Sequence, residues 1–288
     1  MPSPNRQWNA RTLLLIATGL VLLGMVLPYG YLLVYPFRLF NTFIHEVGHA
    51  VAAVATGGQV LEMRVNLDTS GHVMSSGGWR VVISSAGYLG SIAAGAALLL
   101  AGRKRKWARP TLLFVGTATI LSTAAFAGMG ATLAAVLGLV AGLAVVGFGV
   151  RNLNREQPKR GWSLVGVGGV LGVGSLVILT LTGALLTWVI GLGIGAGLLA
   201  VAIMAKPMIQ HLTVLFLGVQ LSVDGLHSVR DLLFITTHNL GHSDAANMAQ
   251  HTGIPATFWA LLWGAMGLVV VAGAFWIFWR DERTSKTS

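Results

Sequence analysis

The amino-acid sequence predicts an all-α polytopic membrane protein with about 8–9 membrane segments and one small β-hairpin. Apolar residues make up 55% of its 288 residues and charged residues only 10%, whereas roughly 25% of residues are charged in soluble domains. Apolar stretches as long as the hydrocarbon core of a bilayer recur along the whole chain. We therefore expect one membrane domain over residues 1–288 and no separate soluble domain.

The basic residues give the chain a net charge of +10, and many of them lie in clusters between the apolar stretches. One cluster contains Arg103, Lys104, Arg105, Lys106 and Arg109, and a second contains Arg151, Arg155, Lys159 and Arg160. The positive-inside rule places such loops in the cytoplasm, which explains the charge without a nucleic-acid partner. Cysteine is absent, so any metal must be bound by histidine and carboxylate rather than by thiolate.

The apolar stretches define the expected membrane segments in chain order. They lie near residues 12–34, 37–56, 81–101, 110–127, 131–150, 163–182, 184–205, 208–235 and 256–279. The first stretch continues through Pro28, Tyr29 and Tyr31 without a small-residue cleavage site, so we expect an uncleaved anchor. The middle segments are rich in small residues, which let membrane helices approach closely.

The two basic loops fix most of the topology. With both loops in the cytoplasm, residues 236–255, which contain no Lys or Arg, lie on the outside. The N-terminal part conflicts, because three segments before Arg103 require an external start whereas Arg6 and Arg11 favour a cytoplasmic one. Either the N-terminus is outside, or one early segment does not cross fully. The short loops and the absence of sorting signals favour a prokaryotic plasma membrane.

Residues 57–78 have a different pattern, in which polar and apolar residues alternate. The polar positions are Glu62, Arg64, Asn66 and Asp68, and the apolar positions are Leu61, Met63, Val65 and Leu67. A period of two predicts a strand from Val60 to Asp68, followed by a turn at 68–71 and a second strand at 72–75. Since an isolated hairpin needs packing partners, we expect it to pack against the membrane domain.

The sequence His45-Glu46-Val47-Gly48-His49 lies within the apolar run Phe37–Ala55. Histidines at i and i+4 project from one helix face, so both imidazoles can bind one Zn²⁺ ion. Zinc lowers the pKa of water to about 7, and Glu46 is placed to act as the base. The composition predicts on the order of 0.003 chance matches to this motif. Ionisable residues inside an apolar segment are functional by default, so we interpret the motif as a hydrolytic metal site.

A catalytic zinc site also needs a third protein ligand. Asp224 and Asp231 are candidates, because they lie seven residues apart and therefore share a helix face in the segment at 208–279. Either could complete the site while the other caps the helix or pairs with Arg230. The residues from Ser243 to Ala246 predict a helix cap, and the short helix that follows is expected to end at 252–255.

Several short blocks of the sequence carry a family resemblance. They are Phe43–Ala50, Thr56–Gly58, Ala86–Gly90, Ser228–Asp231, Ser243–Ala245, Thr252–Trp259 and Trp263. Through these blocks the chain resembles the site-2-protease clan, and most closely its M50B-like branch, over nearly its whole length. The resemblance implies zinc, an active site within the bilayer and a membrane-protein substrate. It also implies that the hairpin at 57–78 holds the substrate as an added strand.

The chain departs from the clan at the third ligand. Classical members carry it in a segment with Asn and Pro that ends in Asp-Gly, whereas this chain has Val223-Asp224-Gly225 without them. The spacing to Ser243-Asp244-Ala245 favours Asp231 as the aspartate of the branch, so Asp231 ranks above Asp224.

The sequence therefore predicts an intramembrane zinc metalloendopeptidase. In this interpretation His45 and His49 bind the metal, Asp231 or Asp224 is the third ligand, and Glu46 is the catalytic acid/base. The motif and the hairpin occupy 37–101, and the candidate third ligands occupy 208–279. The alternative is a non-catalytic membrane scaffold or a transporter that retains a metal site, although a pure transport site has no need of Glu46.

Overall fold

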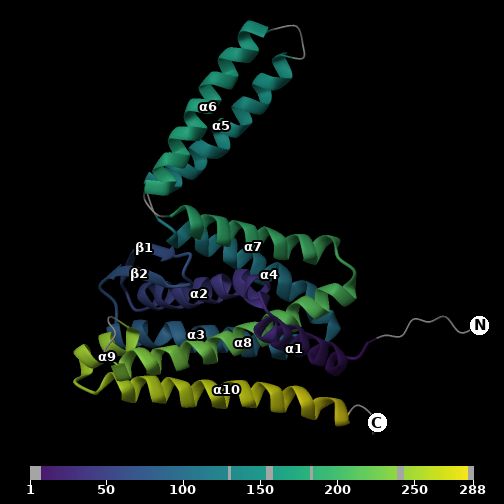
Figure 1. Ribbon diagram of the computed structural model, residues 1–288, viewed down its shortest axis with the longest axis vertical. Helices are drawn as coiled ribbons and strands as arrows, with labels where there is room; N and C mark the ends of the chain where they lie inside the picture. Colours follow the sequence, from purple (N-terminus) through teal and green to yellow (C-terminus); the bar gives the residue numbers. More distant parts are fainter. Residues whose placement is uncertain (1–7, 129–130, 154–157, 182–183, 239–242, 285–288) are drawn as a thin grey trace, which may run out of the picture.

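The computed structural model describes residues 8–128, 131–153, 158–181, 184–238 and 243–284, and this part of the chain is predominantly helical (Figure 1). In chain order the elements are α1 (Ala10–Val26), α2 (Gly30–Ala55), β1 (Gln59–Val65), β2 (Gly71–Ser76), α3 (Arg80–Ala101), η1 (Arg105–Trp107), α4 (Ala108–Phe126), α5 (Ala131–Leu153), α6 (Pro158–Leu181), α7 (Leu185–Met204), α8 (Pro207–His238), α9 (Asp244–Thr252) and α10 (Ala256–Thr284).

Fewer helices qualify as membrane spans than the sequence analysis expected. Within the described residues, 6 helices are long and apolar enough to cross a bilayer, and the total reaches 7 if α1 and α2 together form one span. The expected count of about 8–9 is therefore not confirmed. The difference arises because α1 and α2 were predicted as two separate spans, and because α4 is not among the candidate spans.

The helix break near the N-terminus lies earlier than the sequence analysis placed it. Instead of falling between 34 and 37, it falls at Leu27–Tyr29, where Tyr29 adopts a left-handed conformation with φ of 62°. Pro36 lies inside α2, as membrane helices allow when neighbouring groups satisfy the freed carbonyl. The two helices are bent by 114°. If α1 and α2 form one bent span, the start of α1 and the Arg103 loop lie on one side of the membrane, and the conflict in the expected topology disappears.

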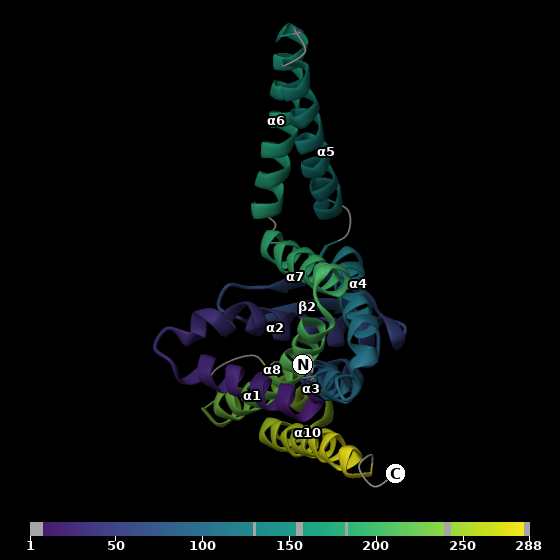
Figure 2. The ribbon, with the colours of Figure 1, turned by 90° about the vertical axis from the view of Figure 1, so that its right-hand side faces the viewer.

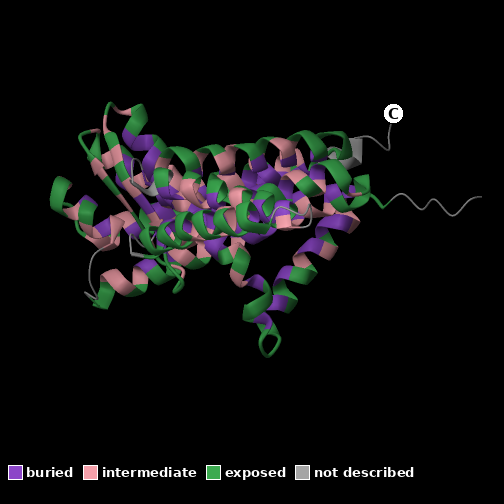
Figure 3. Cartoon of the chain, turned by 90° about the horizontal axis from the view of Figure 1, so that it is seen from above, coloured by how far each residue is buried: buried purple, intermediate pink, exposed green. Residues whose placement is uncertain are grey.

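The helices α2, α3, α8 and α10 lie side by side and form the main body, with α1 packed at one end (Figures 1 and 2). Many residues of this body are buried, and the cartoon in Figure 3 colours them purple. Phe40 and Phe43 of α2 are fully buried in one core cluster with Leu217 of α8. The hairpin of α5 and α6 extends away from the body, and its two helices pack mainly against each other.

The predicted β-hairpin is present, with β1 and β2 paired antiparallel and a bulge between Val60 and Glu62. The first strand ends at Val65 rather than at Asp68, because Asp68 accepts a hydrogen bond from the Ser70 backbone N–H (2.9 Å) and so belongs to the turn. Thr42 of α2 donates to the Thr69 carbonyl of this turn (2.7 Å). The Tyr35 hydroxyl donates to the Leu67 carbonyl. These bonds fix the turn to the helix that carries the metal motif.

Candidate metal centre

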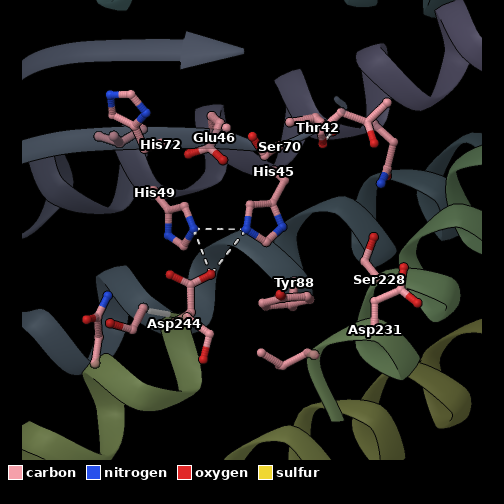
Figure 4. A pocket seen from close by; sticks show the side chains of 18 of the residues that line it. Thr42, His45, Glu46, His49, Ser70, His72, Tyr88, Ser228, Asp231 and Asp244 are labelled. Atoms are coloured by element: carbon pink, nitrogen blue, oxygen red, sulfur yellow. Dashed lines mark hydrogen bonds and ion pairs between the residues drawn. The ribbon is translucent and has the colours of Figure 1, made fainter. Parts of the chain in front are cut away.

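The helix α2 presents His45 and His49 on one face, one turn apart. Their Nε2 atoms lie 3.0 Å from each other, and both point toward the space between α2, α3 and α9 (Figure 4). The backbones of α2 and α3 come close at Gly48, where a Cβ atom would overlap the Ala86 carbonyl. This approach brings the backbone of α3 directly against the two imidazoles.

A carboxylate from a distant part of the chain joins the two histidines. The Asp244 Oδ2 atom lies 3.2 Å from the Nε2 atom of His45 and 3.2 Å from that of His49. Asp244 is the first residue of α9, and Ser243 caps this helix by accepting a hydrogen bond from the Ala246 N–H (3.2 Å). Burial raises the pKa of the Asp244 carboxyl, but the charge and hydrogen bonds of the two histidines outweigh it and hold the pKa below its usual range.

The three ligand atoms fit the requirements of a metal ion. Tetrahedral ligands at the usual Zn–N and Zn–O distances lie about 3.3 Å from one another, and the three distances here are 3.0, 3.2 and 3.2 Å. His49 Nδ1 lies 2.6 Å from the Ile83 carbonyl, so its Nδ1–H donates there and the Nε2 lone pair faces the other two ligands. At Gly87 of α3, a Cβ atom would overlap both Nε2 atoms, so the absent side chain leaves this space open.

Glu46 lies beside the three ligands and beneath the hairpin. Its side chain is 4% exposed, and Figure 4 shows its carboxylate on the side of the histidines that faces β2. A Cβ atom at Gly71, where β2 begins, would lie 2.6 Å from Glu46 Oε1. The start of the strand therefore covers this carboxylate closely, which is a suitable arrangement for a base that must be shielded from bulk water.

The residues of this site lie within a stretch that matches a known protein family. The sequence model of the peptidase M50B-like family matches residues 15–156 and 159–274, which include the two histidines, Glu46 and Asp244. The chain belongs to the peptidase M50B-like family. Searches of curated proteins and of solved structures gave no significant match. Together with its apolar helices, the family membership identifies an integral multi-pass membrane protein.

The structure of this M50B-like chain brings Asp244 to the histidines in place of the two aspartates that the sequence analysis favoured. Among the described residues, the group whose ligand atoms all lie within 4.8 Å of one another is His45, His49 and Asp244. Asp224 is buried in α8 and accepts a hydrogen bond from Gln220 (2.8 Å). Asp231 is exposed and lies beside Ser228, across Tyr88 from Asp244 (Figure 4).

Both of these aspartates still face the cavity that contains the metal centre. The cavity has a volume of about 680 Å³ and extends from β2 across to α8 and α9. Asp224, Asp231 and His227 line it on the α8 side, together with Asn41 of α2. The shared helix face that the sequence predicted for Asp224 and Asp231 is thus a wall of the cavity, opposite the ligands.

Asp244 was the functional candidate that sequence reasoning assigned to another role. The cap at Ser243 and the end of the helix near Gly253 were predicted correctly, and Gly253 has the left-handed conformation of a C-cap (φ 72°). The same block was also part of the family resemblance, which was the available signal. In the sequence this block indicates only the spacing to Asp231, because a helix cap is a sufficient explanation for Asp244.

Proposed function

We propose that this M50B-like protein is a zinc-dependent endopeptidase that cleaves a peptide bond within or beside the membrane. The observation that carries the proposal is the convergence of His45 Nε2, His49 Nε2 and Asp244 Oδ2, with distances of 3.0–3.2 Å between them. Three protein ligands with a fourth open position are the pattern of catalytic rather than structural zinc sites. The adjacent Glu46 is the feature that favours hydrolysis over simple metal binding.

In this proposal His45, His49 and Asp244 hold the metal, which supplies a Lewis acid and activates water near neutral pH when bound. Glu46 accepts the proton of the attacking water on its carboxylate and then donates it to the leaving amine. His49 is oriented for binding by the Ile83 carbonyl, 2.6 Å from its Nδ1. The hairpin over Glu46 limits access of bulk water to the proton that is transferred.

The cavity supports an extended polypeptide segment as the substrate. In the described residues β2 pairs with β1 alone, so its second edge has backbone groups without a strand partner. Residues of β2 and of the preceding turn line the same cavity as the metal ligands. An extended segment that pairs with this edge would lie beside the ligands, because strand addition uses the backbone groups of an exposed edge. Membrane proteins of the same bilayer are the proposed substrates.

The variant Glu46→Gln separates cleavage from metal binding. We expect the purified variant to retain wild-type zinc, since its ligands are unchanged, and to lose at least about 100-fold in cleavage rate. Peptide termini that appear in membranes with the wild type and are missing with Glu46→Gln would identify substrates. If the variant binds zinc and the two sets of termini are identical, the protein is not a peptidase, and its metal site serves a scaffold or transport role.

A further inference from the structure

A second cavity lies on the opposite face of α2 from the metal centre. Its volume is about 480 Å³, and it runs between α2, α3 and α4. On α2 it is lined by Phe40, Phe43, Ile44 and Val47, a spacing that places these residues on the side of the helix away from His45 and His49. The lining is almost entirely apolar, so this groove is suited to a hydrocarbon ligand.

The shape of the groove favours a flexible chain over a helix. Its α4 wall runs from Trp107 to Ser122, a distance of about 22 Å along a helix and longer than the roughly 15 Å of one leaflet's hydrocarbon. A transmembrane helix about 10 Å across would occupy on the order of 2,000 Å³ over the bilayer thickness. The groove volume of about 480 Å³ is far smaller, and it therefore suits an acyl chain.

One end of the groove opens at a concentrated positive charge. Ala101 and Trp107 line this end, and the loop between α3 and α4 carries Arg103, Lys104, Arg105, Lys106 and Arg109. The side chains of the last four are exposed. Within the described part of the chain, none of these four makes a salt bridge with a carboxylate. Lys106 Nζ lies 5.8 Å from the centre of the Trp107 ring. The charge of Lys106 is therefore next to a residue that lines the groove.

We propose that this groove binds an anionic phospholipid of the surrounding bilayer. One acyl chain lies along α4 against Phe43 and Ile44, and the headgroup phosphate lies among Lys104, Arg105, Lys106 and Arg109. Clusters of basic residues at the end of a membrane helix attract anionic lipids by this kind of charge complementarity. The bound acyl chain contacts α2 on the face opposite His45 and His49. The proposal is independent of proteolysis and of zinc binding.

Trp107 provides a local probe, because bromine atoms on an acyl chain quench the fluorescence of a nearby indole. The full-length protein is placed in phosphatidylcholine vesicles that contain a minor fraction of brominated phosphatidylglycerol, or of brominated phosphatidylcholine with the same chains. The contribution of Trp107 is the quenching measured for the wild type minus the quenching measured for Trp107→Phe. This difference removes the signal of the other tryptophans. We expect the brominated anionic lipid to bind several-fold more tightly at Trp107 than the zwitterionic one.

Two variants test the two halves of the site. Neutralising the loop with Lys104→Gln, Arg105→Gln, Lys106→Gln and Arg109→Gln should lower the affinity for the anionic lipid several-fold, to that of the zwitterionic lipid, and leave the affinity for the zwitterionic lipid unchanged. Filling the groove with Ala118→Phe should reduce quenching at Trp107 by both lipids. The matched control is Arg151→Gln with Lys159→Gln and Arg160→Gln, which removes cations from another loop and should leave the preference intact.

The thermal unfolding midpoint of each variant in one detergent shows whether it is folded. Equal quenching of the Trp107 signal by both lipids in the wild type would overturn the proposal. The same loss of preference in the control variant would also overturn it, because the effect would then follow net charge rather than this loop. Loss of preference confined to the neutralised loop supports the site.

Discussion

At the scale of single residues, the metal centre depends on Gly87 as well as on its ligands. The space between the two Nε2 atoms and α3 exists because residue 87 has no side chain. A methyl group there would overlap both nitrogens, and α3 has little room to move away from α2 because α8 and α10 pack against it. If the proposed metal centre binds zinc, its affinity should therefore depend partly on a residue that donates nothing to the metal.

We expect Gly87→Ala to weaken zinc binding by about 10–100-fold, the usual cost of displacing a ligand from its supported position. The measurement is the zinc dissociation constant from competition with a chelator. Gly90→Ala is the matched control on the same helix, since its Cβ atom would lie 3.7 Å from the Gly48 Cα atom, in ordinary contact. Equal affinities for the two variants would show that the space at Gly87 is not needed.

At the scale of elements, the short helix α9 carries Asp244, the proposed third ligand, and the side chain of Ser243 caps the N-terminus of this helix. The Ser243 hydroxyl accepts the hydrogen bond that positions the first turn, in which Asp244 is the first residue. Loss of an N-cap destabilises a helix by about 0.5–2 kcal/mol. A disordered first turn would release the carboxylate from the histidines.

Ser243→Ala should therefore raise the zinc dissociation constant by about two- to thirtyfold. This range is the factor in affinity that corresponds to the free energy of the lost N-cap. Ser243→Thr retains an acceptor oxygen and should restore most of the affinity. The same chelator competition measures both variants. If Ser243→Thr and Ser243→Ala weaken zinc binding equally, the effect comes from packing at residue 243 and not from the N-cap hydrogen bond.

The features that the sequence predicted correctly at this scale are those that depend on short stretches of the chain. His45, Glu46 and His49 could be proposed as site residues from the sequence because their relation is local, within one turn of a helix. The hairpin and the cap at Ser243 were likewise readable from short patterns. The third ligand depends on how α9 folds back against α2, a tertiary contact across about 200 residues of sequence, so spacing alone favoured Asp231. The break at Tyr29 was misplaced because Pro36 resembles a stronger helix breaker than it is within the bilayer.

At the scale of the whole molecule, the metal centre and the basic loop lie at opposite ends of α3. Arg80 at the start of this helix lines the metal cavity, whereas the cluster from Arg103 to Arg109 follows its last residue. The helix has 22 residues, or about 33 Å, which is enough to cross the hydrocarbon core of roughly 30 Å. The cavity therefore lies toward the end of α3 that is opposite the basic loop.

The chain contains no cysteine, so single cysteines can report this arrangement. With Arg105→Cys and Asn247→Cys introduced separately, a membrane-impermeant thiol reagent should label each from a different side. The positive-inside rule predicts the cytoplasmic side for residue 105. Labelling of both positions from one side would contradict the orientation of α3 and the position of the cavity.

The central claim is that Asp244 completes the metal centre, and the zinc content of purified variants tests it most directly. The wild type, Asp244→Ala, Asp231→Ala and Asp224→Ala are purified without chelators and measured for zinc per chain. We expect about one zinc in the wild type, loss of zinc in Asp244→Ala, and wild-type content in the other two variants. Zinc retained in Asp244→Ala but lost in Asp231→Ala or Asp224→Ala would contradict the account, because α8 would then supply the third ligand.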